Sequence, residues 1–431
     1  MNRVVITGIG WVTPMGHAIE PVWKRLLAGE SGIERTTIFD AKTFPTRISA
    51  EVKGFKLDEQ GGDFSKHATA GRSTGFALAA CRAAWGMSKL DAPSLDLDRV
   101  GIYFASGEGS LDFDAYTQAG LSSWSEGDNR IDAVKWAQTA MAMMDPIREI
   151  EQEPNAALPH LAMLTGARGP ALNCLTACAA STQAIGEATE ILRRGDADVM
   201  ISGGAHSMIH PVGVTGFNRL TALSTANDEP AKASRPFDNN RGGFVLGEGA
   251  GVVILETLEH ALSRGAAILA EVVGYGSTAD AFRITDQHPD GAGAVVAMRE
   301  ALKDAGLSPA DVGYINAHGT GTRENDGNET NAIRQVFGER ARKGEGGVPV
   351  SSIKSMMGHL IAAAGAVELI TCVLALRDGV LPPTMNLDHF DPECDLDYIP
   401  NAARKANVTV AMSNSFGFGG QNDTIIVKKP A

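Results

Sequence analysis

The chain has 431 residues, and its 38 basic and 51 acidic side chains give a formal net charge of −13. A negative field of this size repels a phosphate backbone, so the charge argues against nucleic-acid binding. With 44 % hydrophobic and 21 % charged residues, the composition excludes general disorder and predicts a soluble globular protein.

Short apolar runs rich in β-branched residues predict strands, and stretches with helical periodicity between them predict helices. In chain order, strands are predicted at 4–6, 100–104, 198–201, 251–255, 269–273 and 312–316, and helices at 73–85, 181–194, 293–305 and 360–377. This alternation predicts an α/β architecture with largely buried sheets. The apolar stretch 360–376 is interrupted by Glu368 and is too short to span a bilayer, so we expect a buried helix and no membrane association.

Two similar segments suggest that the chain consists of related halves. Residues 4–10 read VVITGIG and residues 271–276 read EVVGYG, and no Pro/Ser-rich linker separates them. We therefore expect two halves, 1–257 and 258–431, packed into one body. The N-terminus lacks the features of a signal peptide, and five unpatterned cysteines indicate neither a disulfide scaffold nor a zinc site. A cytoplasmic location is the expectation.

Cys178 lies directly before the predicted helix 181–194, which places it at a helix start. A cysteine there meets unpaired backbone N–H groups and the positive end of the helix dipole, which are expected to lower the pKa of the thiol. A lone cysteine is more often a buried, inert side chain. The interpretation of Cys178 as a nucleophile therefore depends on its surroundings.

Two histidines follow glycine-containing turns. His318 lies in AHGTGT at 317–322, after a predicted strand, which favours catalysis over packing. His359 ends SSIKSMMGH at 351–359, where a helix N-terminus would disfavour the protonated ring and keep it a neutral hydrogen-bond donor. Glu368 interrupts the apolar helix that follows and needs a partner, for which Lys354 is the candidate.

Other motifs are weaker. The i,i+4 pair His206 and His210 lacks an intervening glutamate and precedes Pro211, so metal binding is disfavoured. Gly8-Ile9-Gly10 lacks the third glycine of a dinucleotide fingerprint. Neither a metal nor a cofactor is predicted.

At Cys178, His318, Lys354 and His359 the sequence resembles the β-ketoacyl-[acyl-carrier-protein] synthases, condensing enzymes of the thiolase superfamily. The resemblance runs from residues 4–10 to 417–422 and is closest to the elongating type II synthases of fatty acid synthesis. It implies a five-layered αβαβα thiolase fold, with the nucleophile in the first half and two catalytic histidines in the second. The implied reaction is decarboxylative Claisen condensation of an acyl thioester on Cys178 with malonyl-carrier protein, giving 3-oxoacyl-carrier protein and carbon dioxide.

The resemblance also implies roles for individual residues. Cys178 would accept the acyl group, and His318 and His359 would act on the malonyl thioester, with Lys354 beside them. The remaining positions are the supporting carboxylates Asp326, Glu329 and Glu368, the gating and oxyanion residues Phe416, Phe418 and Gly419, the pantetheine-binding Thr320 and Thr322, and the acyl-pocket residues Glu108 and Phe217. Without the neighbouring HGTGT segment, Asp326 and Glu329 would be assigned to an exposed turn.

The implied partner is an acyl carrier protein, whose phosphopantetheine arm carries the substrates, so no separate cofactor is expected. A homodimer is implied, with a heterodimer containing a chain-length partner as the alternative. Basic residues for carrier docking are sparse, namely Lys66, Arg72 and Arg219. A specialised polyketide or unusual-lipid ketosynthase stays open, because Glu108 replaces a small or apolar pocket residue and the segment 120–155 is long. A non-catalytic chain-length partner is disfavoured because Cys178 is present.

Overall fold

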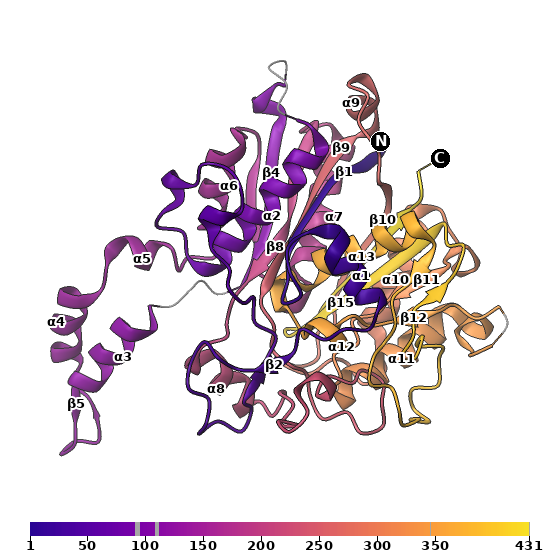
Figure 1. The fold of residues 1–431 in the computed structure, drawn as a ribbon. Helices are drawn as coiled ribbons and strands as arrows, with labels where there is room; N and C mark the ends of the chain where they lie inside the picture. Colours follow the sequence, from indigo (N-terminus) through magenta and orange to yellow (C-terminus); the bar gives the residue numbers. More distant parts are fainter. Residues whose placement is uncertain (91–94, 108–111, 345, 431) are drawn as a thin grey trace.

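The computed structural model describes residues 1–90, 95–107, 112–344 and 346–430. Within these residues, ten strands form one mixed sheet in the order β12-β11-β15-β16-β10-β1-β9-β8-β4-β7 (Figure 1). The first half of the sheet consists of β1 (Val4–Val12), β4 (Val100–Ser106), β7 (Ala171–Cys174), β8 (Val199–His206) and β9 (Gly249–Thr257). The second consists of β10 (Ala270–Ala279), β11 (Tyr314–Asn316), β12 (Val350–Ser351), β15 (Val410–Gly417) and β16 (Gln421–Lys428).

The two halves of the sheet have the same internal order. When the five strands of a half are numbered in chain order, their order across the sheet is 1-5-4-2-3 in both halves. The first two contacts are antiparallel and the last two are parallel in both halves. β1 and β10 pair antiparallel, with Val4 opposite Val272, and join the halves. The proposed boundary at 257/258 coincides with the end of β9, and as a domain division it stays a prediction.

Helices form three layers around the two half-sheets (Figure 1). Between the half-sheets, α7 (Ala180–Arg194) and α13 (Ala364–Asp378) pack against each other. α2 (Arg72–Ser88) and α6 (Ala157–Thr165) cover the outer side of the first half, and α10 (Ala292–Ala305) and α11 (Arg323–Phe337) cover the second. Residues 364–376 of α13 are all buried, as expected of a helix in a central layer. The result is the αβαβα thiolase fold.

Paired glycines explain why segments 4–10 and 271–276 resemble each other. A Cβ atom at Gly8 or Gly10 would lie 2.1 Å from a backbone oxygen of α2. A Cβ atom at Gly274 or Gly276 would lie 2.2 or 2.1 Å from a backbone oxygen of α10. In both halves, the first strand carries glycines because a helix packs directly on its backbone.

The remaining elements lie around this core. The other α-helices are α1 (Ile19–Leu27), α3 (Phe113–Ser122), α4 (Ala133–Met143), α5 (Pro146–Ile150), α8 (Pro211–Arg219), α9 (Leu258–Ser263) and α12 (Lys354–Met357). Two-stranded ribbons pair β2 (Glu34–Arg35) with β3 (Ile48–Ser49), β5 (Trp124–Ser125) with β6 (Arg130–Ile131), and β13 (Val380–Leu381) with β14 (Arg404–Lys405). Figure 1 shows α3, α4 and the β5–β6 ribbon projecting from the body, and α4 and the ribbon belong to the long segment 120–155. Within the described part of the chain, no helix has the length and apolar character needed to cross a membrane.

The six predicted strands all occur, whereas β7, β12, β15 and β16 of the main sheet were missed. The predicted helix 360–377 begins differently. Residues Ile361–Ala363 form a 3-10 turn in which Ile361 has φ +47°, and the α-helix starts at Ala364. This turn positions the residues that directly precede it, including His359.

Candidate active site

The nucleophile candidate lies in a tight turn between a strand and a helix. Cys178 is the middle residue of the 3-10 turn η4 (Ala177–Ala179), which leads into α7, and Ala177 before it has φ +49°. The end of β15 packs directly onto this turn. A Cβ atom at Gly417 would lie 3.0 Å from the Thr176 carbonyl oxygen and 3.2 Å from the Cys178 nitrogen, so only glycine fits there comfortably.

Burial dominates the acid–base behaviour of the thiol. Cys178 is 5 % exposed, and desolvation raises the pKa of its thiol to about 12. The positive charge of Lys354 and the backbone N–H groups of Phe418 and Cys178 act in the opposite direction. The expectation of a lowered pKa at the helix start was therefore wrong, because loss of hydration outweighs the helix N-terminus.

We expect alkylation of Cys178 by iodoacetamide to accelerate about tenfold for each unit of pH, without a plateau through the neutral range. The sign follows from the raised pKa, because only the thiolate reacts and its fraction keeps growing until the pH approaches the pKa. The measurement is the rate of label incorporation at Cys178, followed by peptide mass spectrometry. Cys178→Ala supplies the background, and a plateau near neutral pH would contradict the buried-thiol description.

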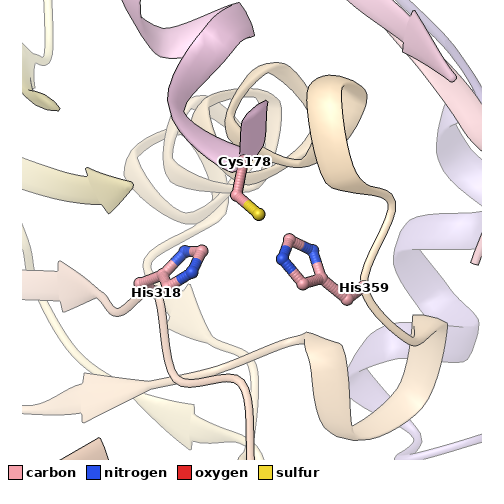
Figure 2. A group of neighbouring side chains, drawn as sticks. All are labelled: Cys178, His318 and His359. Carbon is pink, nitrogen blue, oxygen red and sulfur yellow. The ribbon is translucent and has the colours of Figure 1, made fainter. Parts of the chain in front are cut away.

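Three side chains from distant segments converge at this turn. The ligand atoms of Cys178, His318 and His359 all lie within 4.8 Å of one another, and all three residues are buried (Figure 2). His318 follows β11, and His359 lies between α12 and the 3-10 turn Ile361–Ala363. The two imidazole rings are 5.3 Å apart and nearly perpendicular. The structure thus brings Cys178 together with two histidines that lie 140 and 181 positions after it in the sequence.

Hydrogen bonds fix the tautomers of both histidines. The backbone N–H of Ile361 lies 3.2 Å from His359 Nδ1, and the Lys354 ammonium lies 3.4 Å from His318 Nδ1. Both groups can only donate, so each Nδ1 accepts and each neutral ring carries its proton on Nε2. Burial and the charge of Lys354 hold the pKa of both rings well below the usual value. The prediction that His359 is neutral is confirmed, but burial is the main cause and not a helix N-terminus.

The position of the proton on each imidazole ring decides which kind of ligand Cys178, His318 and His359 can bind. Cysteine with two histidines at such distances resembles a zinc-binding set. A metal ion needs a lone pair on Nε2, whereas here Nε2 carries the proton. Nε2 of His359 has no hydrogen-bond partner in the part of the chain that the structure describes. Two N–H donors beside a thiol instead suit an oxygen that gains negative charge during reaction.

A buried ion pair supports His318. Lys354 and Glu368 are each 2 % exposed and form a direct salt bridge, and Lys354 Nζ also donates to the His318 carbonyl oxygen at 2.6 Å. Burial raises the pKa of Glu368, and the Lys354 charge opposes that shift. The predicted pairing of Glu368 with Lys354 is confirmed.

The carboxylates after the HGTGT segment are fully buried, which excludes the alternative of an exposed turn. Glu329 accepts the backbone N–H groups of His318 and Gly319, both at 2.8 Å, and burial raises its pKa to about 7. Asp326 accepts the N–H groups of Phe237 at 2.7 Å and Gly321 at 3.2 Å. These carboxylates hold the backbone that carries His318.

Sequence reasoning missed Arg241, whose side chain is only 1 % exposed. Its guanidinium donates to the Thr322 carbonyl oxygen at 3.2 Å, forms an ion pair with Asp391 and lies 3.7 Å from Asp326. The signal that could have found it is an arginine between glycine-rich segments, in NNRGGF at 239–244.

A cavity of about 490 Å³ leads from the surface to Cys178. The predicted residues among those lining it are Cys178, His318, Thr320, Thr322, His359, Phe416 and Phe418, and Arg241, Phe244 and Gln287 also line it. The hydroxyl groups of Thr320 and Thr322 are 2.9 Å apart, and Gly419 donates its N–H to the Ile284 carbonyl oxygen at 2.7 Å.

An apolar cluster adjoins the nucleophile. It contains Cys178, Ile209, Val214, Leu223, Phe244, Leu246 and Ile361. Phe217 packs against it, with its ring 5.5 Å from that of Phe244. Glu108, the other predicted acyl-pocket residue, lies outside the described residues. Arg72 is a candidate for carrier docking, but its Nε atom donates a hydrogen bond to the buried Glu248 carboxylate at 2.9 Å.

We expect Gly417→Ala to slow the acylation of Cys178 by on the order of 10²-fold, because the added methyl group displaces the turn that holds the thiol and its neighbouring N–H groups. Single-turnover acyl transfer from a labelled acyl thioester measures this step. Gly86→Ala in α2 is the matched control, since a Cβ atom there would meet nothing within 4 Å and its φ is not positive. Equal rates for Gly417→Ala and wild type would contradict the close packing.

Comparison with known proteins covers the whole chain. Residues 1–261 match the model of the beta-ketoacyl synthase N-terminal domain, and residues 269–388 match that of the C-terminal domain. The chain is 41 % identical to 3-oxoacyl-[acyl-carrier-protein] synthase 2 of Coxiella burnetii, over 99 % of both chains. It is 43 % identical to the protein of the same name from Synechocystis, over 99 % of this chain and 98 % of that one.

Solved structures agree with these matches. A beta-ketoacyl synthase from Burkholderia phymatum superposes with a TM-score of 0.88 at 33 % identity, covering 100 % of both chains. A type II polyketide ketosynthase, solved with its acyl-carrier protein and bound to a hexaketide, superposes with a TM-score of 0.87 at 33 % identity, again over 100 % of both chains. The ishigamide ketosynthase/chain length factor gives 0.86 at 32 % identity over the same coverage.

Proposed function

The chain belongs to the beta-ketoacyl synthase family and is a condensing acyltransferase of fatty acid elongation, and we propose that Cys178, His318 and His359 carry out its reaction. The observation that supports this proposal is that one thiol and two Nε2–H donors lie close together in the lining of the cavity (Figure 2). The proposed substrates are an acyl thioester and a malonyl thioester, both delivered on the phosphopantetheine arm of an acyl carrier protein.

In the first step, Cys178 takes the acyl group by thioester exchange. The bond from Cys178 Sγ to the acyl carbon forms, the bond to the carrier sulfur breaks, and the thiol proton leaves with the carrier thiol. The backbone N–H groups of Cys178 and Phe418 reach the Cys178 sulfur, which places them to stabilise the oxyanion of the tetrahedral intermediate. The high thiol pKa means that this proton must be lost as the acyl group arrives.

In the second step, the malonyl thioester oxygen accepts the Nε2–H groups of His318 and His359. The carbon–carbon bond to the carboxylate breaks, carbon dioxide leaves, and the electron pair is held as an enolate on that oxygen. The enolate carbon then attacks the acyl carbon on Cys178 and a carbon–carbon bond forms. The Cys178 thioester bond breaks, 3-oxoacyl-carrier protein is released, and the thiolate is reprotonated.

Several other residues position Cys178, His318 and His359 or line the cavity beside them. Lys354 is a positioning residue, because it keeps Nδ1 of His318 an acceptor and binds the carbonyl of the same residue. Glu329 and Asp326 hold the backbone at 318–321. Thr320 and Thr322 line the cavity with paired hydroxyl groups, which suits the amide groups of a pantetheine arm.

The deciding experiment supplies malonyl-carrier protein and a ladder of acyl primers to the wild type and to Cys178→Ala. We expect 3-oxoacyl product from the wild type and none from the variant. Absence of product with every primer, or normal condensation by Cys178→Ala, would overturn the proposed function.

A specialised polyketide or unusual-lipid ketosynthase of the same mechanism is the second candidate. The observation that favours it is the likeness to a ketosynthase bound to a hexaketide and to a ketosynthase/chain length factor pair. The number of extensions per primer separates the candidates. A product extended once and then released supports elongation, whereas unreduced chains extended several times support the polyketide assignment.

For the assembly, we propose a homodimer formed along β7. This strand is the last of the sheet, and apolar side chains nearby are exposed, with Leu172 at 44 %, Leu175 at 46 % and Met163 at 54 %. Light scattering should give the mass of two chains, and Leu172→Asp should reduce it to one. A single-chain mass for the wild type would contradict the proposal, and dimerisation only with a related, non-identical chain would replace it by a heterodimer.

A further inference from the structure

His206 is a buried titratable residue that the condensation mechanism does not use. It is the last residue of β8, it is fully buried, and among the described residues neither of its ring nitrogens has a hydrogen-bond partner. Burial lowers its pKa to about 4, so the ring is neutral and offers one donor and one acceptor. A buried polar side chain with both groups unsatisfied costs folding free energy, so it points to a partner that is absent from the free protein.

The position of His206 connects it to the site. Side chains alternate along a strand, so His206 shares a face of β8 with Gly204. A Cβ atom at Gly204 would touch the Ala362 carbonyl oxygen at 2.7 Å and Ser181 at 2.9 Å. That face therefore looks towards the start of α7 and the turn after His359. β8 packs against the 3-10 turn Ile361–Ala363, which follows His359 in the chain.

Space around the imidazole comes from a glycine. A Cβ atom at Gly107 would lie 2.1 Å from His206 Nδ1 and 2.4 Å from its Cε1 atom. No other residue at position 107 could leave the ring where it is. Gly107 and His206 thus form a matched pair at the ends of the neighbouring strands β4 and β8.

The surroundings of His206 on the side of the nucleophile are apolar. Ile209 lies three residues after His206 and belongs to the apolar cluster around Cys178, and Ile361 of the same cluster lies in the turn that packs against β8. An acyl chain attached to Cys178 that enters this cluster meets hydrocarbon side chains. His206 ends the strand that packs against the turn containing Ile361 of this cluster. A purely saturated chain would leave both imidazole nitrogens unpaired.

We propose that His206 recognises an oxygen atom on the acyl chain carried by Cys178, so that the preferred primer is an oxygenated acyl chain bearing a hydroxyl or keto group. This inference rests on the proposed function and names the substrate class of the same site. A hydroxyl group can pair with either nitrogen of the neutral ring, whereas a keto oxygen pairs only with the N–H group. Pockets that hydrogen-bond a substrate oxygen discriminate against the analogue that lacks it, because the protein groups are then left unpaired.

The test compares primers of equal length that are saturated, hydroxylated or keto-substituted at successive positions, each loaded on the carrier protein. The measured quantity is the ratio of kcat/KM for the oxygenated and saturated primers. We expect His206→Leu to lower this ratio about tenfold relative to wild type, and His206→Gln to retain most of it, because an amide keeps a donor and an acceptor. A fall for hydroxylated primers alone identifies the hydroxyl group as the ligand.

Two outcomes would overturn the proposal. One is an unchanged ratio in His206→Leu while condensation continues, and the other is an equal loss for saturated and oxygenated primers, which indicates a structural role. His206→Leu should also unfold at a temperature no lower than wild type, because it removes an unsatisfied buried group. If the wild type condenses no primer of any kind, the proposed function fails instead, and this result is distinct from both.

Discussion

Replacing Lys354 by methionine should lower the free energy of unfolding by about 3–5 kcal/mol, because it leaves Glu368 buried without its partner. The loss should grow as the pH rises. The folded-state pKa of Glu368 is already raised by burial, and removal of Lys354 raises it further. The unfolded chain loses this proton at the usual pKa of 4.5, whereas the folded protein keeps it to higher pH, so stability falls as the pH rises above 4.5 and levels off only above the raised folded-state pKa. Denaturant unfolding at several pH values measures both effects.

The same variant should lose condensation by on the order of 10²-fold or more. Without the Lys354 ammonium, Nδ1 of His318 has no fixed donor, and the ring can place its proton on the wrong nitrogen. Acyl transfer to Cys178 should fall less than decarboxylation. That step uses the backbone N–H groups and not His318, and the loss of the Lys354 charge affects it only by raising the pKa of the thiol further. Separate assays of acyl transfer and of malonyl decarboxylation distinguish the two steps.

The double variant Lys354→Met, Glu368→Leu separates stability from catalysis. Replacing both members of a buried ion pair by apolar side chains is often neutral for stability, so the double variant should unfold close to wild type. Its decarboxylation should remain as slow as that of Lys354→Met. If the double variant recovers activity together with stability, Lys354 acts only by satisfying Glu368 and not by orienting His318.

Local patterns in the sequence were sufficient to identify each reactive side chain, but not to place them together. Cys178, His318 and His359 come from separate segments, and only the sheet order brings β11 and β15 to the turn that carries Cys178. The order itself follows from long-range strand pairing, which no short window of sequence contains.

Burial was the quantity that local reasoning misjudged. Asp326 and Glu329 look like surface residues in a polar segment, yet they are buried because the turning backbone at 318–321 needs acceptors for its N–H groups. The thiol pKa was expected to fall because a helix start was visible in the sequence, whereas the apolar cluster around it was not. β15 was missed for the same reason, since its buried Ser413, Asn414 and Ser415 do not read as an apolar strand.

Replacing His359 by alanine should slow decarboxylation of malonyl-carrier protein by about 10²–10³-fold, since it removes one of the two Nε2–H donors at the enolate oxygen. Acyl transfer to Cys178 should persist, because the backbone N–H groups that serve that step are unchanged. His359→Gln should recover part of the rate, since its amide can supply an N–H group near the same place. Release of carbon dioxide and acyl transfer from a labelled primer are the two measurements.

His318→Ala and the double histidine variant complete this experiment. The single variants should affect decarboxylation similarly, because both rings are neutral, buried and protonated on Nε2. The double variant should lose less than the product of the single losses, since both donors act on one oxygen and their effects are not independent. A different pattern of losses in the two assays would assign His359 a different role. If His359→Ala keeps decarboxylation but loses acyl transfer, then His359 serves as the base for the high-pKa thiol of Cys178 and only His318 stabilises the enolate.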